Sequence, residues 1–457
     1  MSLTNLAEVA AEPAETPLPL AGYGAHCANP ILPGYYADPS LVQDHGKAYI
    51  YATLDPWGGK TLGCWESADF KNWTYRELNW PTKKDCTSKT SKGAMVWAPS
   101  VVKAADGKFY MYVSVGNEVW AGVADAPLGP WRNLLGDKPL IAENYKPGFH
   151  MIDAEAFIDD DGTPWLYWGS GLNWKNGKCW AVKLKPDMAG FDGEPKDVTP
   201  RNYFEGPFML KNAGRYYLMY SSGITIKDTY QVHYAVGDNP LGPFTEGSNS
   251  PILVTNKANN VVSPGHHAVF KKDGQHYILY HRHSIPLDPK FVGRQMCVDL
   301  LNFSADGQME KVVPSHEGPR LVQGRLDGRN IFSDKAVATA SSQLDALHGP
   351  ERVQDDNYAT RWAATANAKG GWLQLDLGEI KHITSQKLRF EYAWKPIPFI
   401  VEVSDNGSDW KCLKEFKDPA VGSPLVINHI ADARYIRLVF PDNIKGADIS
   451  VVEWTVE

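Results

Sequence analysis

Residues 38–53 read DPSLVQDHGKAYIYAT: a short apolar strand, a polar turn with a glycine, then an alternating strand rich in tyrosine. This is the pattern of a β-hairpin. Four further stretches repeat it, namely 98–114 (APSVVKAADGKFYMYVS), 153–169 (DAEAFIDDDGTPWLYWG), 205–222 (EGPFMLKNAGRYYLMYSS) and 266–282 (HHAVFKKDGQHYILYHR). The copies recur every roughly 50–60 residues, about the length of one four-stranded propeller blade. The repeat therefore predicts an all-β fold that contains a five-bladed β-propeller.

The first position of each repeat carries an unusual set of side chains. The aligned residues are Asp38, Ala98, Asp153, Glu205 and His266. The innermost strand of each blade lines the central channel, so equivalent positions converge on the axis. Acidic residues are depleted in strands. Three of them at one repeat position favour a functional site over turn capping or cation binding, and their mutual repulsion should raise at least one pKa.

Three converging carboxyl groups suit the hydrolysis of glycosides. One carboxylic acid protonates the leaving oxygen, and one carboxylate activates water or attacks the sugar. A third carboxyl group can hold the proton donor in place and keep its pKa high enough for donation near neutral pH. The repeat therefore indicates a glycosidase.

Composition limits the other classes of function. Aromatic residues make up 12% of the 457 residues, and their rings both stack on sugars and fill β-rich cores. A net charge of -7 argues against a nucleic-acid partner, which requires basic stripes. No stretch of 18 apolar residues occurs, so no membrane span is expected. Six scattered cysteines form no C-x-x-C pair, which disfavours a zinc ribbon, and isolated buried thiols are the simplest interpretation.

Three segments follow from these patterns. Residues 1–27 lack the basic and apolar regions of a signal peptide and are predicted to be a flexible N-terminal tail. Residues 28–325 are predicted to form the catalytic propeller. Residues 329–457 change to short alternating strands with Gly and Asn turns, which indicates a β-sandwich.

Four short motifs, in this order and spacing, resemble family 43 of the glycoside hydrolases over roughly residues 28 to 325. They are Tyr36-Ala-Asp38-Pro-Ser, Trp97-Ala-Pro-Ser, Ile152-Asp153-Ala-Glu155 and Phe204-Glu205-Gly-Pro207. The resemblance implies that Asp38 is the general base, Asp153 the residue that orients and tunes the acid, and Glu205 the general acid. It also implies inversion in a single displacement, with base and acid about 6.5–9.5 Å apart to admit water.

The resemblance further implies residues around these acids. A channel histidine, placed by the repeat at His266 and not at His267, would hold a hydrated calcium ion that takes no part in the chemistry. Arg294 would reach the sugar or one of the acids. Trp97, beside the second channel position, is the favoured wall of the sugar pocket. Phe157 and Trp168 are further candidates for that wall, with burial in the core as the favoured interpretation of both.

The C-terminal segment resembles the discoidin or factor-5/8 C-type module. The resemblance rests on 338–342 (ATASS), 355–362 (DDNYATRW), 372–378 (WLQLDLG) and 403–410 (VSDNGSDW). It implies a glycan-binding fold with a structural calcium near Asp355 and Thr360, with Glu453 as a further ligand. Asp356-Asn357 stands where that family usually has Gly-Asp. Glycan binding and bracing of the propeller are equally open as its role.

These expectations combine into one functional hypothesis. The protein is expected to be a monomeric, secreted or periplasmic, inverting exo-hydrolase that removes terminal α-L-arabinofuranosyl units from plant oligo- or polysaccharides, with no cofactor needed for the chemistry. A β-D-xylosidase or β-D-galactofuranosidase with the same carboxylates is the first alternative. A non-catalytic glycan-binding propeller, a metal-holding scaffold and an endo-acting enzyme are the others.

Overall fold

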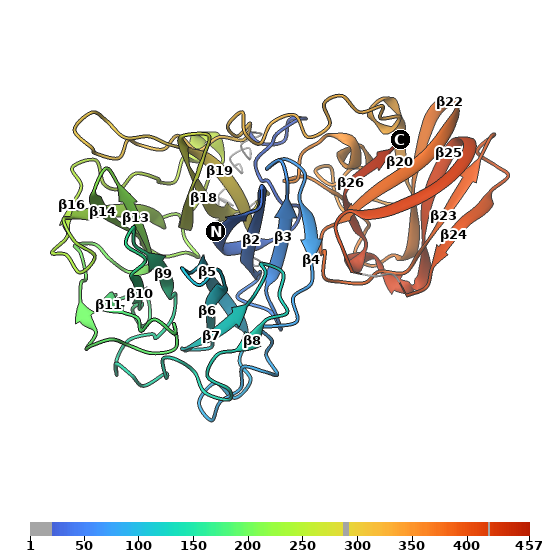
Figure 1. The fold of residues 1–457 in the computed structure, drawn as a ribbon. Coiled ribbons are helices and arrows are strands. Elements are labelled where there is room, and N and C mark those ends of the chain that lie inside the picture. Colours follow the sequence, from blue (N-terminus) through green and yellow to red (C-terminus); the bar gives the residue numbers. More distant parts are fainter. Residues whose placement is uncertain (1–20, 287–291, 419–420) are drawn as a thin grey trace, which may run out of the picture.

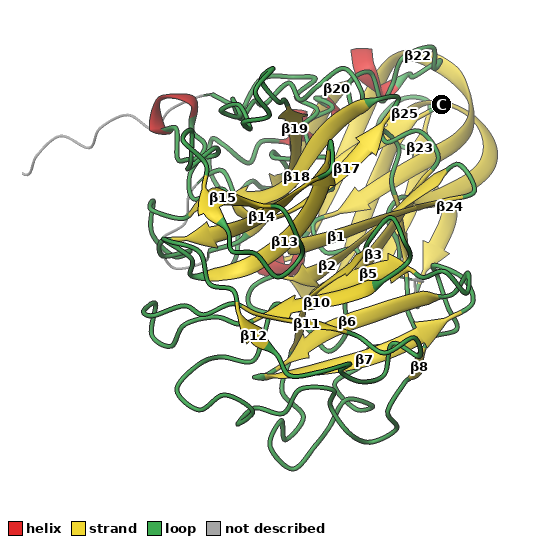
Figure 2. Cartoon of the chain, turned by 60° about the vertical axis from the view of Figure 1, so that its left-hand side comes forward, coloured by secondary structure: helices red, strands yellow, loops and turns green. Residues whose placement is uncertain are grey.

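The computed structural model describes residues 21–286, 292–418 and 421–457. Five antiparallel sheets, each a meander of neighbouring strands, precede a larger C-terminal sheet. In Figure 1 the blue-to-yellow sheets gather around a common centre, and the orange and red strands form a separate layer beside blade 1. The predicted five-bladed β-propeller and C-terminal β-sandwich are confirmed. Helices contribute only short turns (Figure 2).

The blades follow the order of the chain. Blade 1 contains β1 (Tyr36–Asp44), β2 (Lys47–Leu54), β3 (Gly63–Ser67) and β4 (Thr74–Arg76). Blade 2 contains β5 (Val96–Lys103), β6 (Phe109–Val115), β7 (Glu118–Ala124) and β8 (Arg132–Asn133). Blade 3 contains β9 (Glu155–Ile158), β10 (Pro164–Trp168), β11 (Trp180–Lys183) and β12 (Lys196–Asp197). Blade 4 contains β13 (Glu205–Asn212), β14 (Arg215–Ser222), β15 (Gln231–Gly237) and β16 (Thr245–Glu246). Blade 5 contains β17 (Gly265–Lys272), β18 (Gln275–His283) and β19 (Arg294–Leu301).

The apolar cores lie between neighbouring blades. Tyr51 of β2, Met111 of β6 and Trp120 of β7 are fully buried in one such core. Each side chain of this size stabilises the fold by about 1.5–3 kcal/mol on burial. The aromatic residues of the repeat thus hold blade against blade, and this packing sets the position of the inner strands.

The N-terminal segment closes the ring at blade 5. Ile31 N donates to Met296 O at 2.8 Å, and the Asn29 side chain bonds both backbone groups of Val298. Residues near the start of the chain therefore pair with β19, which satisfies backbone groups that an open sheet edge would expose. This pairing joins the first and last blades.

Residues 21–27 do not form the predicted tail, which is a correction. Gly22 O and Gly24 O accept hydrogen bonds from Asn357 Nδ2 at 2.7 and 2.9 Å, and His26 N donates to Asp355 O at 2.7 Å. The partners lie more than 300 positions away in the chain, so local sequence could not reveal them. Residues 1–20 lie outside the described residues.

Two long strands run through the C-terminal sandwich. β22 (Lys369–Phe390) and β25 (Leu425–Lys445) pair along most of their length, with register shifts that bend both. Its core includes the buried Trp362, Leu375 and Trp454. The shorter strands are β20 (Val337–Ala340), β21 (Trp362–Ala363), β23 (Phe399–Ser404), β24 (Lys411–Phe416) and β26 (Ser450–Val456).

Hydrogen bonds also join the sandwich to blade 1. Arg389 Nη1 donates to Trp73 O at 3.0 Å, and Tyr75 N donates to Ser423 O at 2.8 Å.

All six cysteines are unpaired, and only Cys412 is exposed. Within the three described ranges, no helix has the length and apolar character that a membrane crossing requires.

Candidate active site

Each inner strand carries one residue in the left-handed backbone region at or just before its start. These residues are Asp38 (φ 51°), Ala98 (43°), Asp153 (58°), Gly206 (59°) and His266 (37°). The strand register slips at this point in four blades, as it does in a β-bulge. Such strain at non-glycine residues costs about 1–3 kcal/mol each and is typical of functional sites.

This geometry corrects the repeat alignment at the fourth blade. Gly206, not Glu205, occupies the position of Asp38 and Asp153. Glu205 pairs with Ser221 just as Ala37 pairs with Thr53, so it stands one residue before the bulge. A shift of one residue reverses which side of a strand a side chain faces, and only the bulge brings all three carboxyl groups to the channel.

A ring of hydrogen bonds fixes the bulges across the blade seams. In each case a bulge N–H donates to a side chain of the preceding blade. The pairs are Ala98 with Thr53 Oγ1 (2.8 Å), Asp153 with Ser114 Oγ (3.0 Å), His266 with Ser221 Oγ (2.9 Å) and Asp38 with His281 Nδ1 (3.3 Å). The backbone that carries the acids is therefore rigidly held, as a catalytic site requires.

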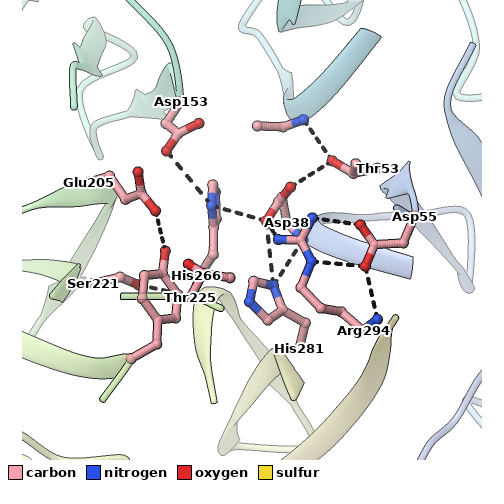
Figure 3. A network of polar contacts seen from close by, with 12 residues as sticks. Asp38, Thr53, Asp55, Asp153, Glu205, Ser221, Thr225, His266, His281 and Arg294 are labelled. Atoms are coloured by element: carbon pink, nitrogen blue, oxygen red, sulfur yellow. Dashed lines mark hydrogen bonds and ion pairs between the residues drawn. The ribbon is translucent and has the colours of Figure 1, made fainter. Parts of the chain in front are cut away.

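Asp38 lies at the centre of a network of polar side chains (Figure 3). Its Oδ1 accepts from Arg294 Nη1 at 2.9 Å and lies 3.2 Å from His266 Nδ1, while its Oδ2 accepts from Thr53 Oγ1 at 2.8 Å. Burial, with only 3% of the residue exposed, would raise its pKa, but Arg294 and the histidines outweigh burial and hold the pKa of Asp38 well below its usual range. Asp38 is an ionised carboxylate.

Asp55 anchors the arginine that contacts Asp38. Its two oxygens accept from Arg294 Nε at 2.9 Å and Nη2 at 2.6 Å, and Oδ2 also accepts from Arg294 N at 2.8 Å. The Trp57 ring covers the guanidinium at 4.9 Å. The bidentate pair fixes the orientation of the guanidinium. Sequence reasoning missed Asp55, which directly follows a strand and precedes a proline, so it resembles an ordinary turn residue.

Asp153 is the least compensated of the three acids. It is 4% exposed, and its Oδ1 has no hydrogen-bond partner. Its other contacts are the N–H of Gly206 and a 3.8 Å approach of His266 Nδ1 to Oδ2. Burial, followed by the nearby Glu205 and Asp38 carboxylates, raises the pKa of Asp153 well above its usual value. This carboxyl group favours its protonated form.

Glu205 accepts two hydrogen bonds from neutral hydroxyl groups. Ser170 Oγ donates to Oε2 and Tyr230 Oη donates to Oε1, both at 2.8 Å. Burial raises the pKa of Glu205, and these two bonds lower it by a smaller amount. The pKa of Asp38 is therefore lowered and the pKa of Glu205 is raised. Opposite shifts of this kind distinguish the base from the acid in one site. Sequence reasoning also missed Ser170 and Tyr230, since serine and tyrosine at strand ends carry no specific signal.

His266 Nδ1 lies 3.2 Å from Asp38 Oδ1 and 3.8 Å from Asp153 Oδ2, so the ring is placed between these two aspartates. Burial lowers its pKa, so the ring is neutral despite the contact with Asp38. His267 is buried with neither ring nitrogen bonded, and its ring packs near Phe208 at 5.7 Å. The hydrated calcium on His266 stays a prediction.

The three aromatic residues predicted to line the sugar pocket differ in where the structure places them. Trp97 is half-buried, and its Nε1 donates to Gly116 O at 3.0 Å. Trp168 is 0% exposed and stacks on Phe191, so its proposed place in the pocket wall is wrong. Phe157 packs against Tyr216 between blades 3 and 4. Packing inside the protein was the other interpretation of both residues. The periodicity of the sequence alone cannot distinguish a packed aromatic residue from one that lines a ligand pocket.

Trp174 was not predicted, yet it stacks on the residue that precedes the acid in the chain. It is 37% exposed and stacks on Phe204, the residue before Glu205, with 5.8 Å between ring centroids. The loop that carries it begins after Ser170, and Asn173, Trp174 and Asn176 in it all have positive φ. An exposed tryptophan on a strained loop beside Glu205 is suited to contact a sugar.

The loop of the C-terminal module brings oxygen atoms together. Thr360 Oγ1 donates to Asp355 Oδ2 at 2.8 Å and to Asn357 O at 3.0 Å, while the Oε2 atom of the buried Glu453 has no partner. Carboxylate, hydroxyl and carbonyl oxygens are the ligands that calcium prefers. In the described part of the chain, no three His, Cys, Asp or Glu side chains gather as a metal site, so carbonyl and hydroxyl groups would have to complete the shell.

At the axis of the five-bladed propeller lie three carboxyl groups, the buried Asp38 and Asp153 and the half-buried Glu205. One is ionised and two have a raised pKa, which is the set of groups that a glycosidase needs. The family model for "Glycosyl hydrolases family 43" matches residues 27–309, more than half of the chain, and the model for the "F5/8 type C domain" matches residues 337–453. The chain belongs to glycosyl hydrolase family 43 and is a glycosidase.

The chain is similar in sequence to relatives with assigned activities. The chain is 35% identical to the β-D-galactofuranosidase xynD of Aspergillus niger over 65% of this chain and 87% of that protein. It is 30% identical to an arabinoxylan arabinofuranohydrolase of Paenibacillus polymyxa over 92% of this chain and 72% of that protein. A solved structure titled "Glycoside hydrolase" superposes with a TM-score of 0.78 at 26% identity, covering 96% of this chain and 100% of that one.

Proposed function

We propose that this enzyme is an inverting exo-hydrolase that removes terminal α-L-arabinofuranosyl units from a plant glycan. The observation that carries the proposal is the opposite displacement of two pKa values in one buried site, with Asp38 held ionised and Glu205 held toward its protonated form. One base and one acid are what a single displacement requires. The arabinoxylan arabinofuranohydrolase relatives support arabinose as the sugar.

In this mechanism Asp38 acts as the base. Its carboxylate removes a proton from water as the water oxygen attacks the anomeric carbon. Arg294 and Thr53 keep the carboxylate ionised and oriented. At the same time Glu205 transfers its proton to the leaving oxygen, and the bond from that oxygen to the anomeric carbon breaks. The product has inverted anomeric configuration.

Asp153 acts on Glu205 and not on the sugar. The Glu205 carboxylate raises the pKa of Asp153, so the two carboxyl groups compete for one proton. A proton held between them keeps Glu205 ready to donate near neutral pH. Burial of Asp153 against the Gly206 N–H fixes its position.

A second candidate substrate is a terminal β-D-galactofuranoside. The relative at 35% identity, of which the chain covers 87%, has this activity in its name. Both sugars react as five-membered rings, and galactofuranose differs by a longer exocyclic chain. The β-D-xyloside alternative rests on relatives at 28% and 26% identity.

Hydrolysis of 4-nitrophenyl α-L-arabinofuranoside, β-D-galactofuranoside, β-D-xyloside and β-D-galactopyranoside tests the proposal. Turnover fastest on the α-L-arabinofuranoside, with the β-anomer of arabinose as first product by NMR, is expected. Faster turnover of another glycoside would make that glycoside the assigned substrate. Retention of the anomeric configuration would refute the inverting mechanism. A well-folded protein inactive on all four would favour the non-catalytic propeller.

We also propose an extracellular or periplasmic site of action, because a polysaccharide cannot enter the cell. We further propose calcium in the C-terminal module, held by Asp355, Thr360 and Glu453. The ion would supply positive charge to the buried Glu453 carboxylate and rigidity to the loop, and no catalytic step uses it. Addition of Ca²⁺ to chelator-treated protein is expected to raise the melting temperature and to leave kcat on the aryl glycoside unchanged. No change in melting temperature would remove the ion from the proposal.

A further inference from the structure

A groove of about 720 Å³ lies between blade 1 and the C-terminal sandwich, apart from the carboxyl groups of the channel. Figure 1 shows β4 on the side of blade 1 that faces the sandwich, and Tyr75 of β4 lines the groove. One wall is the loop after β2, residues 54–61, together with Tyr75 and Glu77. The other wall is formed by Tyr392, Trp394 and the turn that contains Asp448. Neither domain alone makes this groove.

The groove is preformed because contacts between the domains hold both walls. The bond from Tyr75 N to Ser423 O lies at one wall, and Arg389 reaches Trp73 O beside it. The Trp394 ring packs edge-on against Tyr36 of β1 at 5.7 Å, and against Tyr392 at 5.2 Å. Its volume falls within the roughly 300–1,000 Å³ of small-molecule sites, which are usually formed before the ligand binds.

The lining chemistry selects a neutral, amphipathic ligand. Of the charged lining residues, Asp55 is neutralised by Arg294 and Asp448 by Lys395, which leaves Lys60 and Glu77 as one further pair of opposite charges. A phosphorylated or strongly charged ligand would meet no excess of opposite charge. Aromatic rings beside exposed hydrogen-bonding groups instead match a sugar chain, which presents apolar C–H faces and hydroxyl edges.

One loop connects the groove with the catalytic centre. Pro56 and Gly58 line the groove, whereas Trp57 between them covers the Arg294 guanidinium and is 43% exposed. Asp55 of the same loop holds Arg294 on Asp38. A chain bound in the groove therefore lies against the back of the wall that positions the base.

We propose that this groove is a second glycan-binding site, which holds an unbranched stretch of the β-1,4-xylan main chain while the channel hydrolyses side groups. The identity of this ligand rests on the proposed arabinofuranosidase function. The existence of a neutral oligosaccharide site rests on the groove itself. Retention of the polymer by both domains at once gives the C-terminal module a binding role.

The test uses the full chain with Glu205→Gln, which blocks turnover and lies outside the groove, and calorimetric titration with xylohexaose. Binding is expected. A further Glu77→Ala, Lys395→Ala pair, both exposed side chains, should weaken the affinity about tenfold or more. Thr61→Trp, which fills the groove, should abolish binding, and Lys196→Ala on the outer edge of blade 3 is the matched control.

In protein that keeps Glu205, the Glu77→Ala, Lys395→Ala pair should leave kcat/KM for the 4-nitrophenyl glycoside within about twofold of the unmodified protein and lower it several-fold for polymeric arabinoxylan. The inference is overturned if Glu205→Gln does not bind xylohexaose, or if the groove variants bind as tightly as the Lys196→Ala control. Two results together would refute the proposed function and leave the groove site standing. They are a lack of turnover on every aryl glycoside, and xylohexaose binding that the groove variants remove.

Discussion

Arg294 Nη1 of blade 5 contacts Asp38 Oδ1 of the neighbouring blade 1 at 2.9 Å, and the two residues are 256 positions apart in the chain. Two further donors of the same guanidinium, at Nε and Nη2, bond to Asp55. The arginine therefore keeps the proposed base ionised only as long as a second, non-reacting carboxylate fixes its orientation. Three residues from blades 1 and 5 act as one unit.

Asp55→Asn is expected to lower kcat on the aryl glycoside by about 10- to 100-fold, with a smaller change in KM. The amide keeps the size of the side chain but loses the charge that orients Arg294, and small misplacements of catalytic groups have effects of this size. Steady-state kinetics measure the change. Asp69→Asn, an exposed carboxylate of blade 1 that bonds its own loop, should have no effect. If the Asp55→Asn enzyme kept its full kcat, Asp55 would not be needed to position the base.

Glu205→Gln should reduce the rate on unactivated glycosides by several orders of magnitude and leave the fold intact. Substrates with good leaving groups need little protonation, so their loss should be much smaller. A series of aryl glycosides with graded leaving-group pKa measures the difference as a steeper dependence of rate on leaving group. Equal losses across the series would show that Glu205 is not the acid.

Asp38→Asn should abolish turnover for every leaving group, because water must be activated whichever oxygen departs. Circular dichroism and melting temperature verify that the protein still folds. Addition of azide, a nucleophile that needs no deprotonation, is expected to restore part of the rate and to yield an inverted glycosyl azide. Substantial activity without azide would assign the base to another residue.

Tyr230→Phe should move the basic limb of the pH profile of kcat/KM to higher pH. The tyrosine hydroxyl bonds the ionised form of Glu205 and lowers its pKa, so removal raises that pKa. The acid is active when protonated, and a higher pKa keeps it protonated further into the alkaline range. Tyr220→Phe, whose hydroxyl donates to Arg201 O, is the control and should not shift the profile. A shift to lower pH would contradict the assignment of Glu205.

Trp174→Ala should lower kcat/KM for an arabinoxylan oligosaccharide about tenfold or more, because the leaving-group sugar loses an aromatic face beside the acid. The corresponding glycosyl fluoride, which has no sugar on that side, should react at an unchanged rate. Ile226→Ala, another exposed apolar side chain, is the comparison. Equal losses on the oligosaccharide and the fluoride would place Trp174 outside the leaving-group side of the site.

The repeat predicted the fold because each copy is a complete local unit. The hairpin of residues 38–53 needs only its own alternation and turn glycine to specify two strands, and five copies then require a closed ring. The acids Asp38 and Asp153 were found for the same reason. Glu205 was found, but in the wrong register, because a bulge adds a residue that no spacing in the sequence reveals.

By itself, the sequence determined the all-β architecture, the two domains and the three acids, since these depend on periodicity and on residue type at repeated positions. Only the tertiary structure decided which carboxyl group is ionised. That outcome depends on burial and on partners such as Arg294 with Asp55, 239 positions apart, and Ser170 with Glu205. Electrostatic free energy is set by distances in space, which neighbours in the chain do not specify.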